Sequence, residues 1–136
     1  MPRDLNPATI TAHISDNAKF AYEDYRLSLR RLGINLTSHE IFQRIMLGLS
    51  KKHIELILED AIMKLSDDQM ATSQARLSTH YVNSDARLAF DEFVLLLRRK
   101  RSMIKYSKQV VQGLGLALER PEVRSPLLPL MQADLP

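Results

Sequence analysis

Apolar residues recur at spacings of three and four along almost the whole chain, and this periodicity restricts the fold more than any other feature. The first such segment runs from Pro7 to Leu32, with Asn6 as its N-cap and Gly33 as its stop. Its apolar stripe consists of Ile10, Ile14, Ala18, Ala21, Tyr25, Leu29 and Leu32. Strand signals are nearly absent, because no alternating run of β-branched or aromatic residues is flanked by a tight-turn sequence. We therefore predict an all-α fold.

Capping signals predict the helices that follow. Thr37 and Glu40 form a T-x-x-E capping box, and Gly48 ends the short helix that they open. Ser50 is suited to cap a third helix, and Ser66 opens a second capping box ahead of a polar fourth segment. The predicted spans are 37–48, 50–65 and 66–79, followed by a long basic helix over 84–111.

The chain of 136 residues suits one small domain, which we place at residues 1–112 with four to five helices. Beyond Gly113, four prolines stand among leucines over residues 113–136, a density that disfavours a helix or a central strand. We expect this tail to be an extended arm, either disordered or docked on another subunit. We find no internal repeat, and no low-complexity tract outside the tail.

The chain lacks the residue patterns of common catalytic and metal sites. It has no cysteine, and its four histidines stand on separate segments without metal-ligand spacing. The glycines form no dinucleotide-binding or phosphate-binding loop, and no G-x-S-x-G motif is present. Glu55 and Glu59 are four residues apart, and we interpret them as a solvated helix face instead of a general acid–base pair. We therefore predict a protein that is not an enzyme and holds no metal or cofactor.

Features of export and membrane insertion are also missing from the sequence. The first residues contain no apolar run of the signal-peptide type. No stretch approaches the roughly 18 apolar residues of a membrane span. We expect a cytoplasmic protein without a membrane partner.

One segment concentrates the positive charge. Six basic residues and no acid lie within residues 98–108, so the rest of the chain is at −3 against a total of +3. Such a segment neutralises phosphates and suits contact with double-stranded DNA. The predicted contacts are Arg98, Arg99, Lys100, Arg101, Lys105 and Lys108. A solvated helix surface, or a basic face that meets an acidic subunit, stays open as an alternative.

The apolar stripe of the first predicted helix suits a self-association surface. A long helix with a continuous apolar face must bury that face, and a second copy of the chain can cover it. The candidate interface residues are Ile10, Ile14, Ala21, Tyr25 and Leu29. An intramolecular core built from the same residues is an equal alternative.

Four spaced fragments resemble the FlhD family, the helical subunit of the flagellar master transcriptional activator. They are HISD at 13–16, RLGI at 31–34, Leu49-Ser50 followed by Ile54, Leu56 and Glu59, and SDARL at 84–88. The resemblance implies an all-α subunit that dimerises, joins an FlhC-like zinc-binding partner, binds promoter DNA and recruits RNA polymerase. The missing cysteine rules out an intersubunit disulfide and, with the Pro-rich tail, indicates a divergent member of the kind also found on conjugative elements.

The leading hypothesis is therefore a subunit of an FlhD-like, DNA-binding transcriptional activator complex. A helical adaptor or chaperone that binds only proteins is the alternative, with the basic helix docked on an acidic partner. A stand-alone helix-turn-helix protein using residues 37–65 is a third hypothesis. Glu55, Glu59 and Asp60 disfavour it, because they would face phosphates. The target promoter and the oligomer size do not follow from the sequence.

Overall fold

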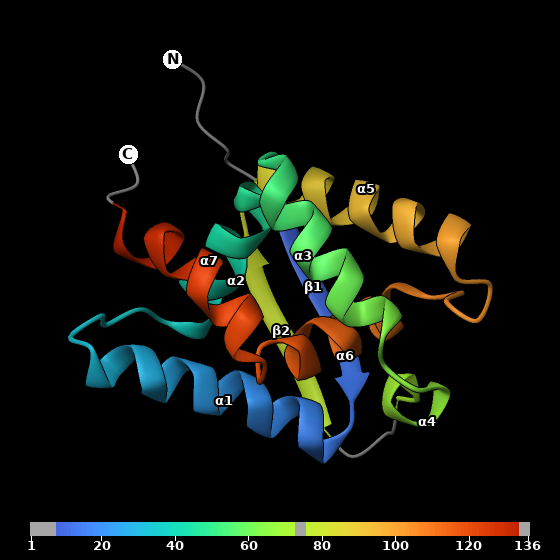
Figure 1. The fold of residues 1–136 in the computed structure, drawn as a ribbon, viewed down its shortest axis with the longest axis horizontal. Coiled ribbons are helices and arrows are strands. Elements are labelled where there is room, and N and C mark those ends of the chain that lie inside the picture. The colour runs from blue at the N-terminus through green and yellow to red at the C-terminus, as the bar shows by residue number, and fades with distance from the viewer. Residues whose placement is uncertain (1–7, 73–75, 134–136) are drawn as a thin grey trace.

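The computed structural model describes residues 8–72 and 76–133 and shows a two-stranded antiparallel sheet packed against helices. Its elements are β1 (Ala8–Ile14), α1 (Asp16–Arg31), α2 (Ser38–Gly48), α3 (Lys52–Met63), α4 (Asp67–Met70), β2 (Arg76–Val82), α5 (Ser84–Lys100), α6 (Ser107–Ala117) and α7 (Pro121–Gln132). In Figure 1 the strands run between α1 along the lower edge and α5 along the upper edge. The chain is mostly helical, as predicted, but the sheet means that the fold is not purely all-α.

The first correction concerns residues 8–14, predicted as the start of a helix and found as β1. Three buried side chains alternate here with three exposed ones, which is the period of a strand with one buried face. The buried residues are Ile10, Ala12 and Ile14, and the exposed ones are Thr9, Thr11 and His13. A spacing of four from Ile10 to Ile14 fits a helix equally well, and this ambiguity misled the prediction. Asn6 and Pro7, the predicted start of that helix, lie outside the described residues.

The second correction concerns the polar segment 66–79, of which only α4 is helical. The Ser66 capping box opens this helix as predicted, and the chain then extends into β2. Each of the seven residues of β2 has a partner in β1. Two of its buried positions are polar, Ser78 and His80, so no apolar alternation marks this strand in the sequence.

The chain contains the same strand–helix–helix order twice. We call β1–α1–α2 (residues 8–48) and β2–α5–α6 (residues 76–117) the first and second strand–helix–helix units. Buried residues of α1 and α5 correspond at a constant offset, as Tyr25 does to Phe93 and Leu29 to Leu97. The expectation of no internal repeat is therefore wrong for the structure. The repeat keeps the burial pattern, the helix caps and several identical residues, such as Leu29-Arg30-Arg31 and Leu97-Arg98-Arg99.

Each strand–helix–helix unit is completed by the other. Helix α2 packs on β2 and α6 packs on β1, while α1 packs on α6 and α5 packs on α2. A two-fold axis through the ribbon would produce this exchange. The two units of the single chain thus have the arrangement of a dimer.

Hydrogen bonds follow the same exchange between the units. Gln112 in α6 accepts from the backbone N–H of Ser15, and Gln43 in α2 accepts from that of Asn83, both at 2.8 Å. Ser15 and Asn83 are the N-caps of α1 and α5. Because a backbone N–H that is buried without a partner costs free energy, these glutamines set how each second helix meets the other unit.

Helices α3 and α4 are inserted between the two units, and α7 follows the second. Helix α3 packs on α6 and α7, α4 packs on α6, and α7 also packs on α2. Helix α6 is therefore enclosed, and residues 110–118 are all buried. Such a helix belongs to the centre of the core and not to the margin of the domain.

The predicted long helix and extended tail are both corrected. Helix α5 ends at Lys100, where Arg101 turns to an extended conformation with φ −141°, and α6 begins only at Ser107. Gly113, taken as the start of the tail, lies inside α6. Residues 121–132 form α7 instead of an extended arm.

Packing explains why α7 is helical despite two internal prolines. Its buried face is formed by Val123, Leu127 and Met131, at the spacing of one helical stripe. Pro126 and Pro129 leave the carbonyls of Glu122 and Ser125 without a helical partner, but both residues are exposed to water. Arg44 of α2 donates to the carbonyls of Leu130 and Met131 at 3.0 and 3.3 Å and so caps the C-terminal end of α7.

The predicted caps of the second helix are confirmed. Thr37 Oγ1 accepts from the Glu40 N–H at 3.1 Å, and Glu40 Oε1 accepts from the Thr37 N–H at 3.0 Å. Gly33 follows α1 with φ +84°, a conformation that favours glycine. Ser50 does not cap α3, because the N-cap is Lys51 and has no side-chain cap.

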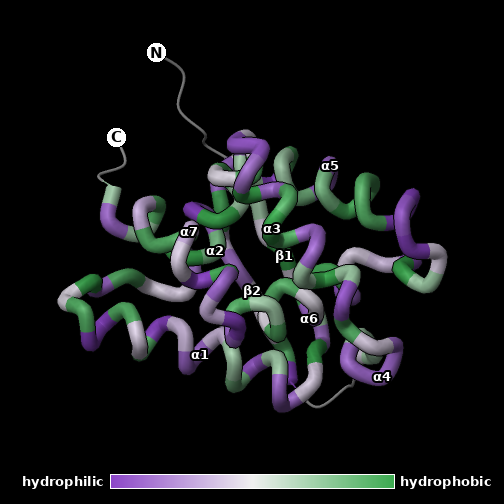
Figure 2. The backbone as a smooth tube through the Cα atoms, viewed as in Figure 1, coloured by the Kyte–Doolittle hydropathy of each residue, from purple (hydrophilic) through white to green (hydrophobic). Residues whose placement is uncertain are grey.

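The five candidate interface residues lie in the core of the single chain. Ile10, Ile14, Ala21, Tyr25 and Leu29 are each 3% exposed or less. Figure 2 shows hydrophobic and hydrophilic residues alternating along α1, as in a helix with one buried face. The intramolecular alternative therefore describes these residues.

We predict that Gln112→Ala lowers the free energy of unfolding by about 1–3 kcal/mol, measured by urea denaturation. The substitution removes the partners of the Ser15 N–H, the Ser15 hydroxyl and the Gln69 carbonyl at a site that is 1% exposed. Gln43→Ala is the matched control and should cost less, since Gln43 is only half-buried and water can reach the Asn83 N–H. Equal losses for the two variants would contradict this account.

Candidate nucleic-acid interface

The outer face of the β1–β2 ribbon remains exposed while the helices pack on its inner face. The cross-strand pairs on this outer face are Thr9–Tyr81, Thr11–Thr79 and His13–Leu77. Leu77 and Tyr81 are 52% and 57% exposed. The face thus offers hydroxyl, imidazole and phenol groups beside one large apolar side chain. It carries no carboxylate, which would repel a phosphate.

A cation lies at each end of the ribbon. Lys19 of α1 donates to the Leu77 carbonyl at 3.4 Å, and Arg87 of α5 donates to the Thr9 carbonyl at 2.7 Å. These contacts are equivalent in the two units. They satisfy carbonyls on the two open edges of the sheet and set a positive charge beside each strand.

The N-termini of α2 and α6 occupy equivalent positions beside the ribbon. His39, two residues after the N-cap of α2, accepts from the Tyr81 N–H at 3.1 Å, and the two rings are 4.9 Å apart. Lys108 has the same place in α6, two residues after Tyr106, and its Nζ lies 5.5 Å from the Tyr106 ring centre. Helix N-termini attract anions through free N–H groups and the helix dipole. The start of α6, with Lys108 and no acid in its first turn, suits a phosphate, whereas the start of α2 already holds the Glu40 carboxylate.

An aromatic layer supports the ribbon from below. The His80 ring stacks on Phe42 with 4.2 Å between centroids, and its Nε2 lies 2.8 Å from Ser78 Oγ. Burial, with a smaller contribution from His39 and Lys19, lowers the pKa of His80 to about 4. His80 is therefore neutral at neutral pH, so the ribbon rests on an uncharged layer.

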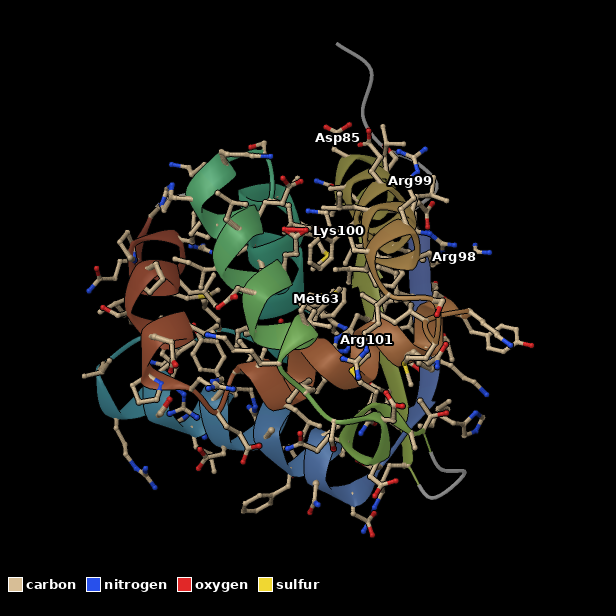
Figure 3. All side chains as sticks on the ribbon, turned by 45° about the vertical axis from the view of Figure 1, so that its right-hand side comes forward. Met63, Asp85, Arg98, Arg99, Lys100 and Arg101 are labelled. Carbon is tan, nitrogen blue, oxygen red and sulfur yellow. The ribbon has the colours of Figure 1, made fainter. Side chains whose placement is uncertain are left out.

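Two of the six predicted DNA contacts are occupied within the chain. Lys100 pairs with Glu59 of α3, and Arg101 donates to Asp67 Oδ1 at 2.9 Å and to the Ile62 carbonyl at 3.0 Å. Figure 3 shows Lys100 and Arg101 pointing toward α3. They tie the end of α5 to the α3–α4 connection. Glu59, interpreted from sequence as solvated, is 7% exposed and needs this cation.

The other four predicted contacts are accessible. Arg98, Arg99 and Lys105 are exposed and Lys108 is half-buried, and Figure 3 shows Arg98 and Arg99 pointing away from α3. Helix α1 ends in an exposed pair, Arg30 and Arg31, at the positions equivalent to Arg98 and Arg99. Basic groups are therefore present in both units, whereas the sequence prediction recognised only one set.

The sequence prediction missed the six outward residues of the ribbon. The alternation of Thr9, Thr11 and His13 with apolar neighbours was a readable strand signal. The second signal was the recurrence of a strand, a capped helix and another helix after 68 residues, as from Ser15 to Asn83.

Comparison with protein-family models, with curated proteins and with solved structures finds no match to this chain. Within residues 8–72 and 76–133, no group of three or more histidine, aspartate or glutamate side chains could hold a metal ion. Over the same residues, no helix is both long enough and apolar enough to cross a membrane.

We predict that Arg101→Ala lowers the free energy of unfolding by about 1.5–3 kcal/mol, because it removes charge-assisted hydrogen bonds from a largely buried guanidinium. Arg98→Ala and Arg99→Ala should change it by no more than about 0.5 kcal/mol, as surface substitutions do. Urea denaturation at neutral pH measures all three. A loss as large in Arg98→Ala as in Arg101→Ala would contradict the assignment of Arg98 to the exposed residues and of Arg101 to the internal contacts.

We predict that His80 makes the folded state less stable as the pH falls from about 6.5 to about 4. Its pKa is lowered in the folded state, so below the unfolded pKa the unfolded chain binds a proton that the folded chain does not. The full loss amounts to about 3 kcal/mol. His80→Gln should reduce the slope of stability against pH in this range, measured by urea denaturation of parent and variant at several pH values. A slope as steep in the variant as in the parent would contradict the prediction.

Proposed function

We propose that this protein binds double-stranded DNA in a sequence-specific manner and regulates transcription, with the outer face of the β1–β2 ribbon as the reading element. The observation that carries the proposal is the exposed, carboxylate-free ribbon with a helix N-terminus beside each end. This surface is shared by both units, whereas the basic run belongs to one of them.

The dimensions of the ribbon suit the major groove. This groove is about 12 Å wide in B-DNA and admits a two-stranded ribbon. Two paired strands lie about 4.8 Å apart, and seven residues span about 23 Å. Threonine hydroxyls can donate to or accept from base edges, and an apolar side chain such as Leu77 can contact a thymine methyl group. The side chains of the outer face are therefore suited to read the base sequence directly.

Phosphate contacts would come from groups that flank the ribbon. The N–H groups at the start of α6 suit one phosphate, and Lys108 adds a positive charge there. Lys105, Arg98 and Arg99 are accessible for further contacts on this unit. Such contacts would position the ribbon without reading sequence, and they make the affinity fall with salt.

One chain carries both strands of the ribbon, and the strands present different side chains. Thr9, Thr11 and His13 face outward from β1, whereas β2 presents Leu77, Thr79 and Tyr81. The backbone is thus approximately two-fold symmetric, but the side chains of the outer face are not. A single chain would bind a site whose halves differ in sequence.

The FlhD-like assignment, the activator role and the zinc-binding partner stay predictions. The ribbon supports DNA binding without any of them, since both strands and both helix N-termini belong to this chain. The alternative of an adaptor that binds only proteins predicts no response to DNA, and the experiment below separates the two.

The test uses the purified chain in a selection from random double-stranded DNA, followed by fluorescence anisotropy with the selected site at several salt concentrations. Thr11→Asp with Thr79→Asp sets two carboxylates at the centre of the outer face, where they would meet the groove. We expect an affinity loss of about 100-fold or more, because like charges face each other across the interface. The selected site should lack two-fold symmetry.

The matched control is His53→Asp with Ser125→Asp, which adds two carboxylates at exposed positions of α3 and α7. It should bind DNA within a few-fold of the parent. Full binding by the folded ribbon variant would exclude the ribbon as the interface. Failure of the parent chain to bind any DNA at low salt would reject the proposed function itself.

A further inference from the structure

Four large apolar side chains are exposed on the first helices of the two units. Phe20 and Leu27 of α1 are 68% and 42% exposed, and Leu88 and Leu95 of α5 are 59% and 52% exposed. Within each helix the two residues are seven apart, which places them on one face two turns from each other. Neighbouring exposed apolar residues at this spacing are typical of a surface that contacts another protein.

The two apolar faces correspond under the approximate two-fold symmetry. Phe20 takes the position of Leu88, and Leu27 that of Leu95, each 68 residues apart as are the caps Ser15 and Asn83. Figure 1 shows α1 and α5 on opposite edges of the molecule and running in opposite directions. We call these surfaces the α1 flank (Phe20 and Leu27) and the α5 flank (Leu88 and Leu95).

The ends of the two flanks are complementary in charge. Helix α1 has Asp16 in its first turn and Arg30 and Arg31 in its last, and α5 has Asp85 in its first turn and Arg98 and Arg99 in its last. When two such helices pack antiparallel, the acidic start of each lies beside the basic end of the other. In this register Phe20 would lie opposite Leu95, and Leu27 opposite Leu88.

We propose that the α1 flank of one chain docks antiparallel on the α5 flank of a second copy of the same chain. Because α1 and α5 already run in opposite directions, a sideways displacement of the second copy without rotation brings the two flanks together. The contact is head-to-tail, so each chain of a docked pair keeps one free flank and further copies can add to form a row. The occupant of both apolar faces is thus the chain itself.

The association is weak in free solution and stronger on a template. Two apolar side chains per flank bury little area, and Glu23 and Glu92 stand in the middle of the two helices and repel each other. The flanks lie at the two ends of the ribbon, because α1 follows β1 and α5 follows β2. If the ribbon lies along a DNA groove, which rests on the proposed function, neighbouring copies meet through these flanks.

The test is sedimentation velocity of the full chain without DNA, over a range of concentrations, so it does not depend on the proposed function. The first variant carries Phe20→Glu with Leu27→Glu and loses the α1 flank. The second carries Leu88→Glu with Leu95→Glu and loses the α5 flank. Leu56→Glu, at a 47% exposed position of α3, is the control for an added charge at an apolar surface residue. Circular dichroism verifies that each variant is folded.

The parent chain and Leu56→Glu should show a sedimentation coefficient that rises with concentration, while each flank variant alone stays monomeric. An equimolar mixture of the two flank variants should form dimers and nothing larger, since each supplies the flank that the other lacks. A parent chain that stays monomeric at every concentration would overturn the proposal. Self-association of the α5-flank variant alone, or a mixture that stays monomeric, would overturn it as well.

Discussion

The pairing of β1 with β2 is the contact on which the rest of the structure depends. The two strands are more than 60 residues apart in sequence, and all seven positions of each are paired. Closing so long a loop costs entropy, which local structure alone does not offset. The helices offset it, because each second helix covers the strand of the other unit and buries apolar surface there. A single unit would leave this surface open.

Buried polar groups decide how the two units fit together. Gln112 and Gln43 each reach the N-cap of the other unit, and His80 lies neutral beneath the ribbon against Phe42. Gln112 and His80, which are buried, tolerate few alternative arrangements, since a shift leaves a buried donor or acceptor without a partner. They give the ribbon one register and one position on the helices, which an outward-facing reading surface requires.

The same arrangement leaves two kinds of surface available for partners. The outer face of the ribbon is polar and has no helix over it, and the flanks on α1 and α5 are apolar. In a chain of this size the helices suffice to cover one face of a two-stranded sheet. The other face of the sheet stays without a helix over it. The proposed binding surfaces therefore follow from the topology of the chain and not from a single motif.

The sequence by itself determined the elements whose signals are local: the α2 capping box of Thr37 and Glu40, the Gly33 stop after α1, and the apolar faces of the helices. Only the tertiary structure decided the rest. β2 has polar residues at buried positions and exists because β1 pairs with it, and α7 is helical because packing outweighs two prolines. Lys100 and Arg101 belong to the basic run, but they bind acceptors on α3 and α4 within the chain. No sequence pattern links these acceptors to the basic run. Each of these depends on residues distant in sequence, and local periodicity carries no information about such partners.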